Sequence, residues 1–251
     1  MKYNWNWGIL WQESLDGRNT WIMTLIHGLG WTLLTALCAA VIALLLGSVI
    51  GVVRTTDRRW LVRLGNAYVE LFRNIPLLVQ LFLWFFVLPE LLPKGLGDAL
   101  KHMAPPWGSL VPAVIGLGLF TAARVAEQVL AGIQSLPRGQ RWAGTALGLT
   151  QAQTYRYVLL PMAFRIIMPP LSSETMNLIK NTSVALTIGL IELTAAARAM
   201  QEFTFQVFEA FTAATVIYIV VNLIVVNLMR WLERRVAVPG FIGPAAVGGA
   251  H

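Results

Sequence analysis

The sequence predicts an all-α integral membrane protein with five transmembrane helices, and three observations lead to this fold class. Of the 251 residues, 57% are hydrophobic and only 12% are charged. Soluble domains contain about 25% charged residues, so half that share indicates a membrane protein. The apolar residues form long continuous runs, and about 20 such residues allow a helix to cross a bilayer. The basic residues gather at the ends of these runs, as is usual in membrane proteins.

Five apolar runs account for the expected spans. They cover about residues 31–53, 68–88, 108–133, 162–190 and 210–229. The first run carries no charge and contains Gly47 and Gly51, a GxxxG pair that permits close contact between helices. The fourth run is expected to break at Pro169–Pro170, because proline interrupts helical hydrogen bonding.

The distribution of basic residues predicts an orientation. Twelve of the 19 Lys and Arg residues fall on one side of the five runs and five fall on the other, while Arg124 and Lys180 lie within runs. Cytoplasmic loops carry the excess of Lys and Arg. We therefore expect the N-terminus outside and the C-terminus in the cytoplasm. A nucleic-acid partner is not expected, since no soluble face carries the charge.

A polar segment between the third and fourth runs, residues 137–161, shows the pattern of two helices joined by a turn. Pro137 suits the first turn of a helix. Gly148 suits a helix end that requires a left-handed backbone. Thr150 and Gln153 form a capping box that starts the next helix. From periodicity alone, an ordinary cytoplasmic loop lying on the membrane explains this segment equally well.

Charged residues inside the runs are the second functional signal, because burying a charge at the bilayer centre costs about 2.5–3.5 kcal/mol. Arg124 and Glu127 are three residues apart, so they are expected to pair on one helix face. Asn177 and Lys180 follow the expected helix break, and transporters build binding sites from discontinuous helices. The alternatives are a purely structural ion pair and a lysine that reaches the membrane interface.

Four segments resemble polar amino acid permeases of ABC importers, and the likeness covers about residues 28–239. The segments are ELFRNIPLLVQLF (70–82), AEQVLAGIQSLPRGQ (126–140), ALGLTQAQTYRYVLLP (146–161) and NLIKNTSVALTIGL (177–190). The likeness is strongest to permeases of glutamate/aspartate importers. It implies that residues 1–251 form one membrane domain with the type I permease fold, in which residues 137–161 are a cytoplasmic coupling loop, closed by Leu160–Pro161.

The resemblance implies a bacterial inner-membrane permease subunit of an ATP-driven, binding-protein-dependent importer of glutamate or aspartate. Such a subunit is not an enzyme and holds no cofactor or metal, because ATP and Mg belong to separate ATPase subunits. Its implied partners are those ATPases, a second permease subunit, a solute-binding protein outside the membrane, and membrane lipid. Trp142 stands where the family carries an acidic residue, so an ion pair to the ATPase from that position is missing.

The charges within the apolar runs and the expected helix break make four residues the candidates for substrate binding: Arg124, Glu127, Asn177 and Lys180. The resemblance assigns coupling to the ATPase to Gly139, Ala143, Ala146, Leu147, Gly148, Leu149, Thr150, Tyr155, Leu160 and Pro161.

The main alternative is a secondary transporter or channel that works without ATP. It needs an ion-coupling carboxylate within the spans, and Glu127 and Glu174 are the candidates that the apolar runs offer. Enzymatic ATP hydrolysis by a phosphate-binding loop is excluded, because no lysine in the chain follows a glycine.

Overall fold

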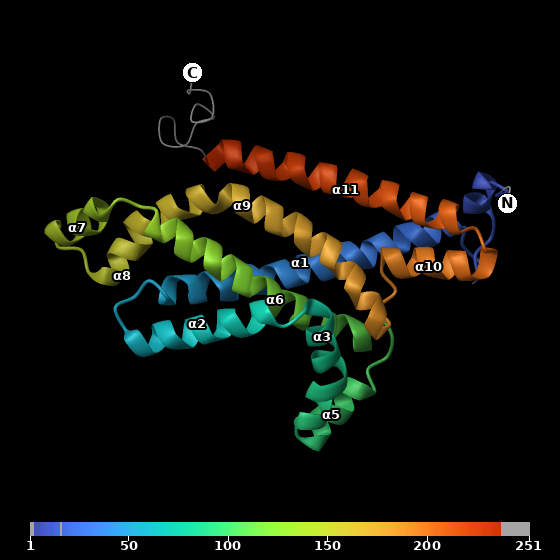
Figure 1. Ribbon diagram of the computed structural model, residues 1–251, viewed down its shortest axis with the longest axis horizontal. Helices are drawn as coiled ribbons and strands as arrows, with labels where there is room; N and C mark the ends of the chain where they lie inside the picture. Colours follow the sequence, from blue (N-terminus) through green and yellow to red (C-terminus); the bar gives the residue numbers. More distant parts are fainter. Residues whose placement is uncertain (1–2, 16, 237–251) are drawn as a thin grey trace.

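The computed structural model describes residues 3–15 and 17–236, and within these ranges the chain is helical, with no β-strand. Four long helices run along the length of the molecule: α1 (Trp21–Val53), α6 (Trp107–Gln134), α9 (Leu160–Asn181) and α11 (Val207–Val236) (Figure 1). The all-α fold class is thereby confirmed. The expected single domain extends to residue 251, and its part from residue 237 onward lies outside the described residues.

Shorter elements connect these helices and occupy the two ends of the molecule. They are η1 (Trp7–Trp11), α2 (Arg59–Asn74), α3 (Leu77–Phe82), η2 (Leu83–Val87), α4 (Leu88–Leu91), α5 (Lys94–Lys101), α7 (Arg138–Ala146), α8 (Gln151–Thr154), η3 (Tyr155–Leu159), η4 (Thr182–Ile188) and α10 (Leu193–Thr204). Here η1 and η4 are 3₁₀ helices, and η2 and η3 are π-helical turns. The helices α7 and α8 project at one end, and α10 lies with the N-terminal segment at the other (Figure 1).

Within the described residues, three helices, α1, α6 and α11, are long and apolar enough to cross a membrane without interruption. The number rises to five if each of two bent helix pairs counts as one span: α2 with residues 77–91, bent by 103°, and residues 151–188 with α10, bent by 51°. The second expected run, 68–88, is therefore not a straight helix. The chain turns at Ile75, which is extended (φ −93°, ψ 127°), because the ring of Pro76 disfavours helical geometry in the residue before it.

The break expected at Pro169–Pro170 is wrong, since both prolines lie inside α9. A membrane offers no water to satisfy an unwound backbone, so transmembrane helices tolerate prolines that would end a helix in water. The interruption comes later, at Gly189, which has the left-handed φ of 83° after η4. It separates α9 and η4 from α10.

Close packing of α1 against α6 confirms the GxxxG contact. A Cβ at Gly47 would lie 2.7 Å from the Cβ of Val125, and one at Gly51 would lie 2.6 Å from the Cβ of Val129. These distances are shorter than carbon atoms tolerate, so only glycine permits this approach. The α1–α6 contact in turn fixes the spacing of the helices that carry the charged residues described below.

We expect Gly51→Ala to destabilise the protein by about 1–3 kcal/mol, because the added methyl group overpacks the α1–α6 contact. Gly30→Ala, in the same helix, is the matched control, since no atom lies within 4 Å of a Cβ there. Thermal unfolding of both variants in detergent measures the difference. Equal melting temperatures would contradict the packing role of Gly51.

Candidate functional site

The 137–161 segment has the helix–turn–helix form predicted from its sequence. Helix α7 ends at Ala146, and Gly148 follows with the left-handed φ of 75°. The Gly148 N–H donates to the Thr145 carbonyl, and the Leu149 N–H donates to the Gly144 carbonyl, each at 3.0 Å. This pair of bonds is a Schellman motif, which closes a helix with glycine at the left-handed position. The predicted role of Gly148 as a helix stop is confirmed.

The second helix of the segment begins with the predicted capping box. The Gln153 N–H donates to Thr150 Oγ1 at 3.3 Å, and the Thr150 N–H donates to Gln153 Oε1 at 2.8 Å. The segment does not close at Leu160–Pro161, however, because the π-helical turn η3 leads directly into α9. Pro161 lies in the first turn of α9, where a missing N–H costs least. The second helix of the segment is thus continuous with a long helix of the membrane domain.

The turn between α1 and α2 anchors this segment. The Tyr155 hydroxyl donates to the Thr55 carbonyl at 2.9 Å and lies 2.9 Å from Thr55 Oγ1. Asp57 accepts hydrogen bonds from Arg141 of α7 at 3.2 Å and from Gln151 of α8 at 3.3 Å. One turn therefore holds both helices of the segment.

The residues predicted to couple to an ATPase divide into an exposed group and an anchoring group. The exposed ones are Gly139, Ala143, Ala146, Leu147, Gly148, Thr150 and Pro161. Leu149 and Leu160 are partly exposed, while Tyr155 is buried and belongs to the anchor. Trp142 and Leu147 are 69% and 79% exposed, so α7 presents an apolar surface at the end of the molecule.

A charged cavity of about 420 Å³ lies between α2, α6 and α9. Its lining consists of Arg73, Phe120, Arg124, Glu127, Gln128 and Glu174. Arg124 Nη1 lies 3.7 Å from Glu174 Oε1, and the guanidinium carbon is 5.1 Å from the centre of the Phe120 ring. The Arg124 side chain is 43% exposed and the Glu174 side chain only 15%. Arg124 is therefore an accessible cation with a loosely held partner.

The expected pairing of Arg124 with Glu127 is wrong. Glu127 Oε1 instead accepts from Arg54 Nη2 at 2.9 Å and lies 3.4 Å from Arg73 Nη1. The two residues are neighbours on α6, but their partners come from other helices. Glu174 of α9 pairs with Arg124, while Arg54 at the end of α1 and Arg73 of α2 pair with Glu127. Such long-range partners outcompete an i,i+3 pair, which is worth only about 0.2–0.5 kcal/mol.

The structure does not bring Lys180 or Asn177 to this cavity. Lys180 lines a separate groove of about 610 Å³ between α9 and α11, together with Ser183, Thr194, Tyr218 and Asn222. Lys180 comes six positions after Glu174, which is a rotation of about 240° around the helix, so the two side chains face different neighbours. Asn177 is half-buried and lies on neither lining.

Buried carboxylates that sequence reasoning missed lie at helix starts. Glu192 is fully buried and caps α10 by accepting from the backbone N–H groups of Thr194 at 3.0 Å and Ala195 at 2.8 Å. It also accepts from the Tyr218 hydroxyl at 2.9 Å. An acidic residue directly before a helix is an N-cap signal that was available in the sequence. Glu192 is thus a buried carboxylate with a structural role, as the cap of α10.

Glu209 is the other missed buried carboxylate, in the first turn of α11. It accepts from the backbone N–H of Asn6 at 2.7 Å and from the Tyr3 hydroxyl. These bonds tie the N-terminal segment to α11, so this carboxylate too serves the fold.

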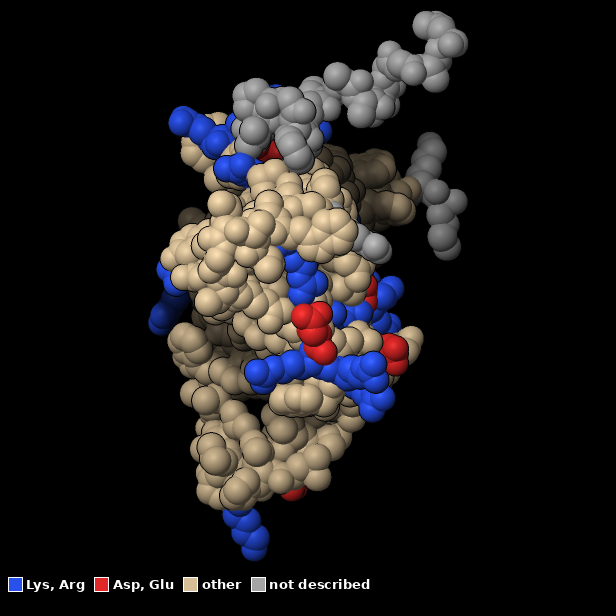
Figure 2. Space-filling model, turned by 90° about the vertical axis from the view of Figure 1, so that its left-hand side faces the viewer, with Lys and Arg blue, Asp and Glu red and all other residues tan. Residues whose placement is uncertain are grey.

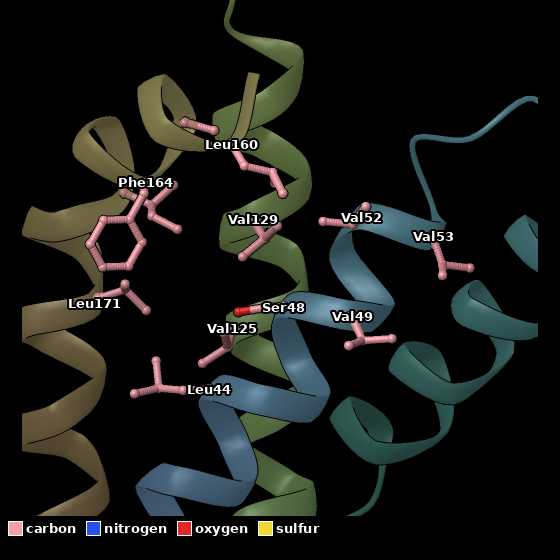
Figure 3. A pocket seen from close by; sticks show the side chains of 12 residues that line it. Leu44, Ser48, Val49, Val52, Val53, Val125, Val129, Leu160, Phe164 and Leu171 are labelled. Atoms are coloured by element: carbon pink, nitrogen blue, oxygen red, sulfur yellow. The ribbon is translucent and has the colours of Figure 1, made fainter. Parts of the chain in front are cut away.

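A larger cavity, of about 570 Å³ between α1, α6 and α9, is unsuited to an amino acid (Figure 3). Leu44, Val125, Phe164 and Leu171 converge on it, and the only polar side chain in its lining is that of Ser48. Moving a charged ammonium or carboxylate into such a lining is very costly without partners. Of these two cavities, the smaller charged one is the better candidate for a substrate site, since its lining contains two arginines and two carboxylates.

Comparison with other proteins identifies relatives over nearly the whole chain. The family described as binding-protein-dependent transport system inner membrane component matches residues 43–238. The glutamate/aspartate import permease protein GltJ of Escherichia coli K12 is 47% identical over 244 residues, which is 97% of this chain and 99% of the relative. GltK of E. coli O6:H1, also a glutamate/aspartate import permease protein, is 34% identical, with 85% of this chain and 93% of GltK covered.

Solved structures agree with this result. A crystal structure of an amino acid ABC transporter with histidines superimposes with a TM-score of 0.73 at 31% identity, covering 86% of this chain and 95% of that one. An inward-facing methionine ABC transporter, MetNI, gives a TM-score of 0.70 at 19% identity, which shows the fold alone. The fold is the type I permease fold that the sequence predicted, and the chain belongs to the family of inner membrane components of binding-protein-dependent ABC transport systems.

Proposed function

We propose that this chain is the permease subunit of an importer that moves glutamate and aspartate across the bacterial inner membrane. The observation that carries the acidic preference is the charge of the cavity cluster. Three guanidinium groups, of Arg54, Arg73 and Arg124, face two carboxylates, of Glu127 and Glu174. The cluster therefore has one positive charge in excess, which complements an amino acid with a second carboxylate and the net charge of −1.

Arg73 and Arg124 are the accessible arginines that offer this charge to a ligand, since their side chains are 56% and 43% exposed. Arg54 is committed to Glu127 at hydrogen-bonding distance and is only 9% exposed, whereas Arg124 lies 3.7 Å from its partner. An incoming side-chain carboxylate can accept two parallel hydrogen bonds from a guanidinium, a geometry that a neutral amide or hydroxyl does not reproduce. The names of GltJ and GltK support the same choice of substrates.

ATP-dependent coupling is proposed to pass through the 137–161 segment. Its exposed apolar residues, Trp142 and Leu147, suit docking on an ATPase subunit without the acidic contact of other family members. Hydrolysis of ATP with Mg then belongs to that partner, and a solute-binding protein delivers the amino acid on the opposite side. Membrane lipid surrounds the apolar flanks of α1 and α11. Only 28% of the most apolar stretch of α1 and 17% of that of α11 are buried within the protein.

The second permease subunit is proposed to be a different, GltK-like chain rather than a second copy of this one. E. coli O6:H1 contains both a GltJ and a GltK, each called a glutamate/aspartate import permease protein. The present chain is 47% identical to GltJ and 34% identical to GltK. It thus corresponds to one member of an unequal pair.

The proposed topology places the N-terminus outside and the 137–161 segment in the cytoplasm. Figure 2 looks at the end of the molecule that carries α7 and α8, and Lys and Arg residues gather around it. The excess of basic residues marks the cytoplasmic side. The opposite end carries Trp5, Trp7 and Trp11, which are 60%, 46% and 74% exposed, and exposed tryptophans favour the interface between membrane and water.

The alternative of an ATP-independent secondary transporter is weaker. Its candidate ion-coupling carboxylates, Glu127 and Glu174, are both paired with arginines. Paired carboxylates suit a fixed balance of charge rather than the repeated uptake and release of a coupling ion.

The test is purification in mild detergent after co-expression with the ATPase, the GltK-like chain and the binding protein. We expect this chain, the GltK-like chain and the ATPase to co-purify. In liposomes, with the binding protein present, the complex should accumulate aspartate and glutamate only when ATP is supplied on the cytoplasmic side. Glutamine uptake with the same binding protein is the control for charge selectivity. Accumulation without the ATPase would contradict the proposal and favour secondary transport.

A further inference from the structure

We propose that the turn between α1 and α2, residues 54–57, is the mechanical link between the 137–161 segment and the charged cavity, with Arg54 as the positioning residue on the cavity side. The inference rests on the proposed function, since it concerns how ATP-driven movement reaches the substrate. It assigns roles to Arg54, Thr55 and Asp57, none of which belongs to the segment or to the cavity lining.

On the cavity side, Arg54 joins three helices. Located at the end of α1, it donates from Nε to Asn66 of α2 at 2.7 Å and from Nη2 to Glu127 of α6 at 2.9 Å. Glu127 itself lines the cavity beside Arg124. A displacement of Arg54 therefore moves the carboxylate of Glu127 or weakens the ion pair that neutralises it.

The Arg54 side chain is packed closely against Gly65 of α2. A Cβ on Gly65 of α2 would lie 2.6 Å from Arg54 Cγ, so the stem of the arginine passes where a side chain on α2 would stand. The Arg54 side chain is 9% exposed, and its Nη1 is buried without a hydrogen-bond partner in the described part of the chain. An arginine held in this way cannot swing aside, because its stem is enclosed and two of its donors are committed.

On the other side, the next residues of the same turn hold the 137–161 segment. Thr55 bonds the Tyr155 hydroxyl through its carbonyl at 2.9 Å, and Asp57 bonds Arg141 of α7 and Gln151 of α8. Only two residues, Thr55 and Thr56, lie between Arg54 and Asp57. A movement of α7 and α8 thus pulls on a short turn whose first residue is fixed to a cavity carboxylate.

This arrangement predicts what movement does. When the segment shifts, the turn carries Arg54 with it, and the Arg54–Glu127 contact lengthens or shortens. Glu127 is then more or less available to Arg73, which lies 3.4 Å from it in the present state. The net charge of the cluster stays the same, but the electrostatic field at the substrate position changes with the state of the ATPase, which favours binding in one state and release in the other.

The experiment compares Arg54→Gln, Tyr155→Phe and the double variant in the assembled complex in liposomes, with the binding protein present. We measure aspartate transported per ATP hydrolysed. Each single variant is expected to assemble and to lower this ratio, Arg54→Gln by tenfold or more. If both residues act in one link, the transport ratio of the double variant is no lower than that of the more affected single variant. The first substitution already uncouples the 137–161 segment from the cavity, so the second has nothing further to uncouple.

The exposed Arg58, directly after this turn, provides the matched control, and Arg58→Gln is expected to keep the wild-type ratio. If Arg54→Gln does not assemble, Arg54→Lys carries the same test, since it keeps the charge but not the fork that reaches both Asn66 and Glu127. Single variants at the wild-type ratio, or a double variant with multiplied defects, would overturn the link. A wild-type complex that does not transport with ATP would instead overturn the proposed function.

Discussion

Arg124→Gln is expected to lower glutamate and aspartate transport by about 30-fold. Losing one member of a desolvated charge pair costs about 2–5 kcal/mol, and about 1.4 kcal/mol corresponds to a factor of ten. We place the effect near the lower end because the Arg124 side chain is 43% exposed and therefore partly screened. The substitution removes the excess positive charge of the cluster and leaves Glu174, 15% exposed, without its arginine.

The measurement is uptake by the reconstituted complex with the binding protein held constant, because the binding protein selects substrates first. Glutamine uptake should fall much less than aspartate uptake, since glutamine has no side-chain carboxylate. Lys180→Gln is the matched control, a loss of positive charge in the separate groove between α9 and α11. Wild-type aspartate transport by Arg124→Gln would make Arg124 structural, and a larger loss from Lys180→Gln would move the site to the other groove.

Gly148→Val is expected to disrupt the 137–161 segment and to abolish most ATP-dependent uptake. Gly148 has φ 75°, a conformation that costs a β-branched residue about 1–3 kcal/mol. The Schellman motif that joins α7 to α8 then opens, and the exposed apolar residues Trp142 and Leu147 lose the fixed position that docking on the ATPase requires. Association with the ATPase, measured by co-purification, should weaken by about 5-fold to 150-fold, which is the same free energy expressed as a ratio.

Gly148→Asn separates backbone strain from the bulk of a new side chain. Asparagine tolerates the left-handed conformation far better than valine does, and no atom lies within 4 Å of a Cβ at this position. We therefore expect Gly148→Asn to assemble nearly as well as the wild type. Equal losses from asparagine and valine would indicate that the surface at Gly148, and not its backbone conformation, determines ATPase association.

The sequence by itself determined the features that depend on local chemistry. The continuous apolar runs predict membrane helices because a bilayer accepts only backbones with satisfied hydrogen bonds. Gly148, Thr150 and Gln153 predict the joint of the 137–161 segment because a helix end and a capping box need only a few adjacent residues. The small residues Gly47 and Gly51 likewise predict a close helix contact. Each of these predictions is confirmed in the structure.

Tertiary structure decided which charges meet. Arg124 and Glu127 are three residues apart, yet Arg124 pairs with Glu174 of α9 and Glu127 with Arg54 of α1, because packed helices bring in partners more than 40 residues away. It also decided that α9 passes through Pro169–Pro170 and that Lys180 faces away from the charged cavity. A pairing between distant residues depends on how helices pack and rotate, and that information is spread over the whole chain rather than held in any local pattern.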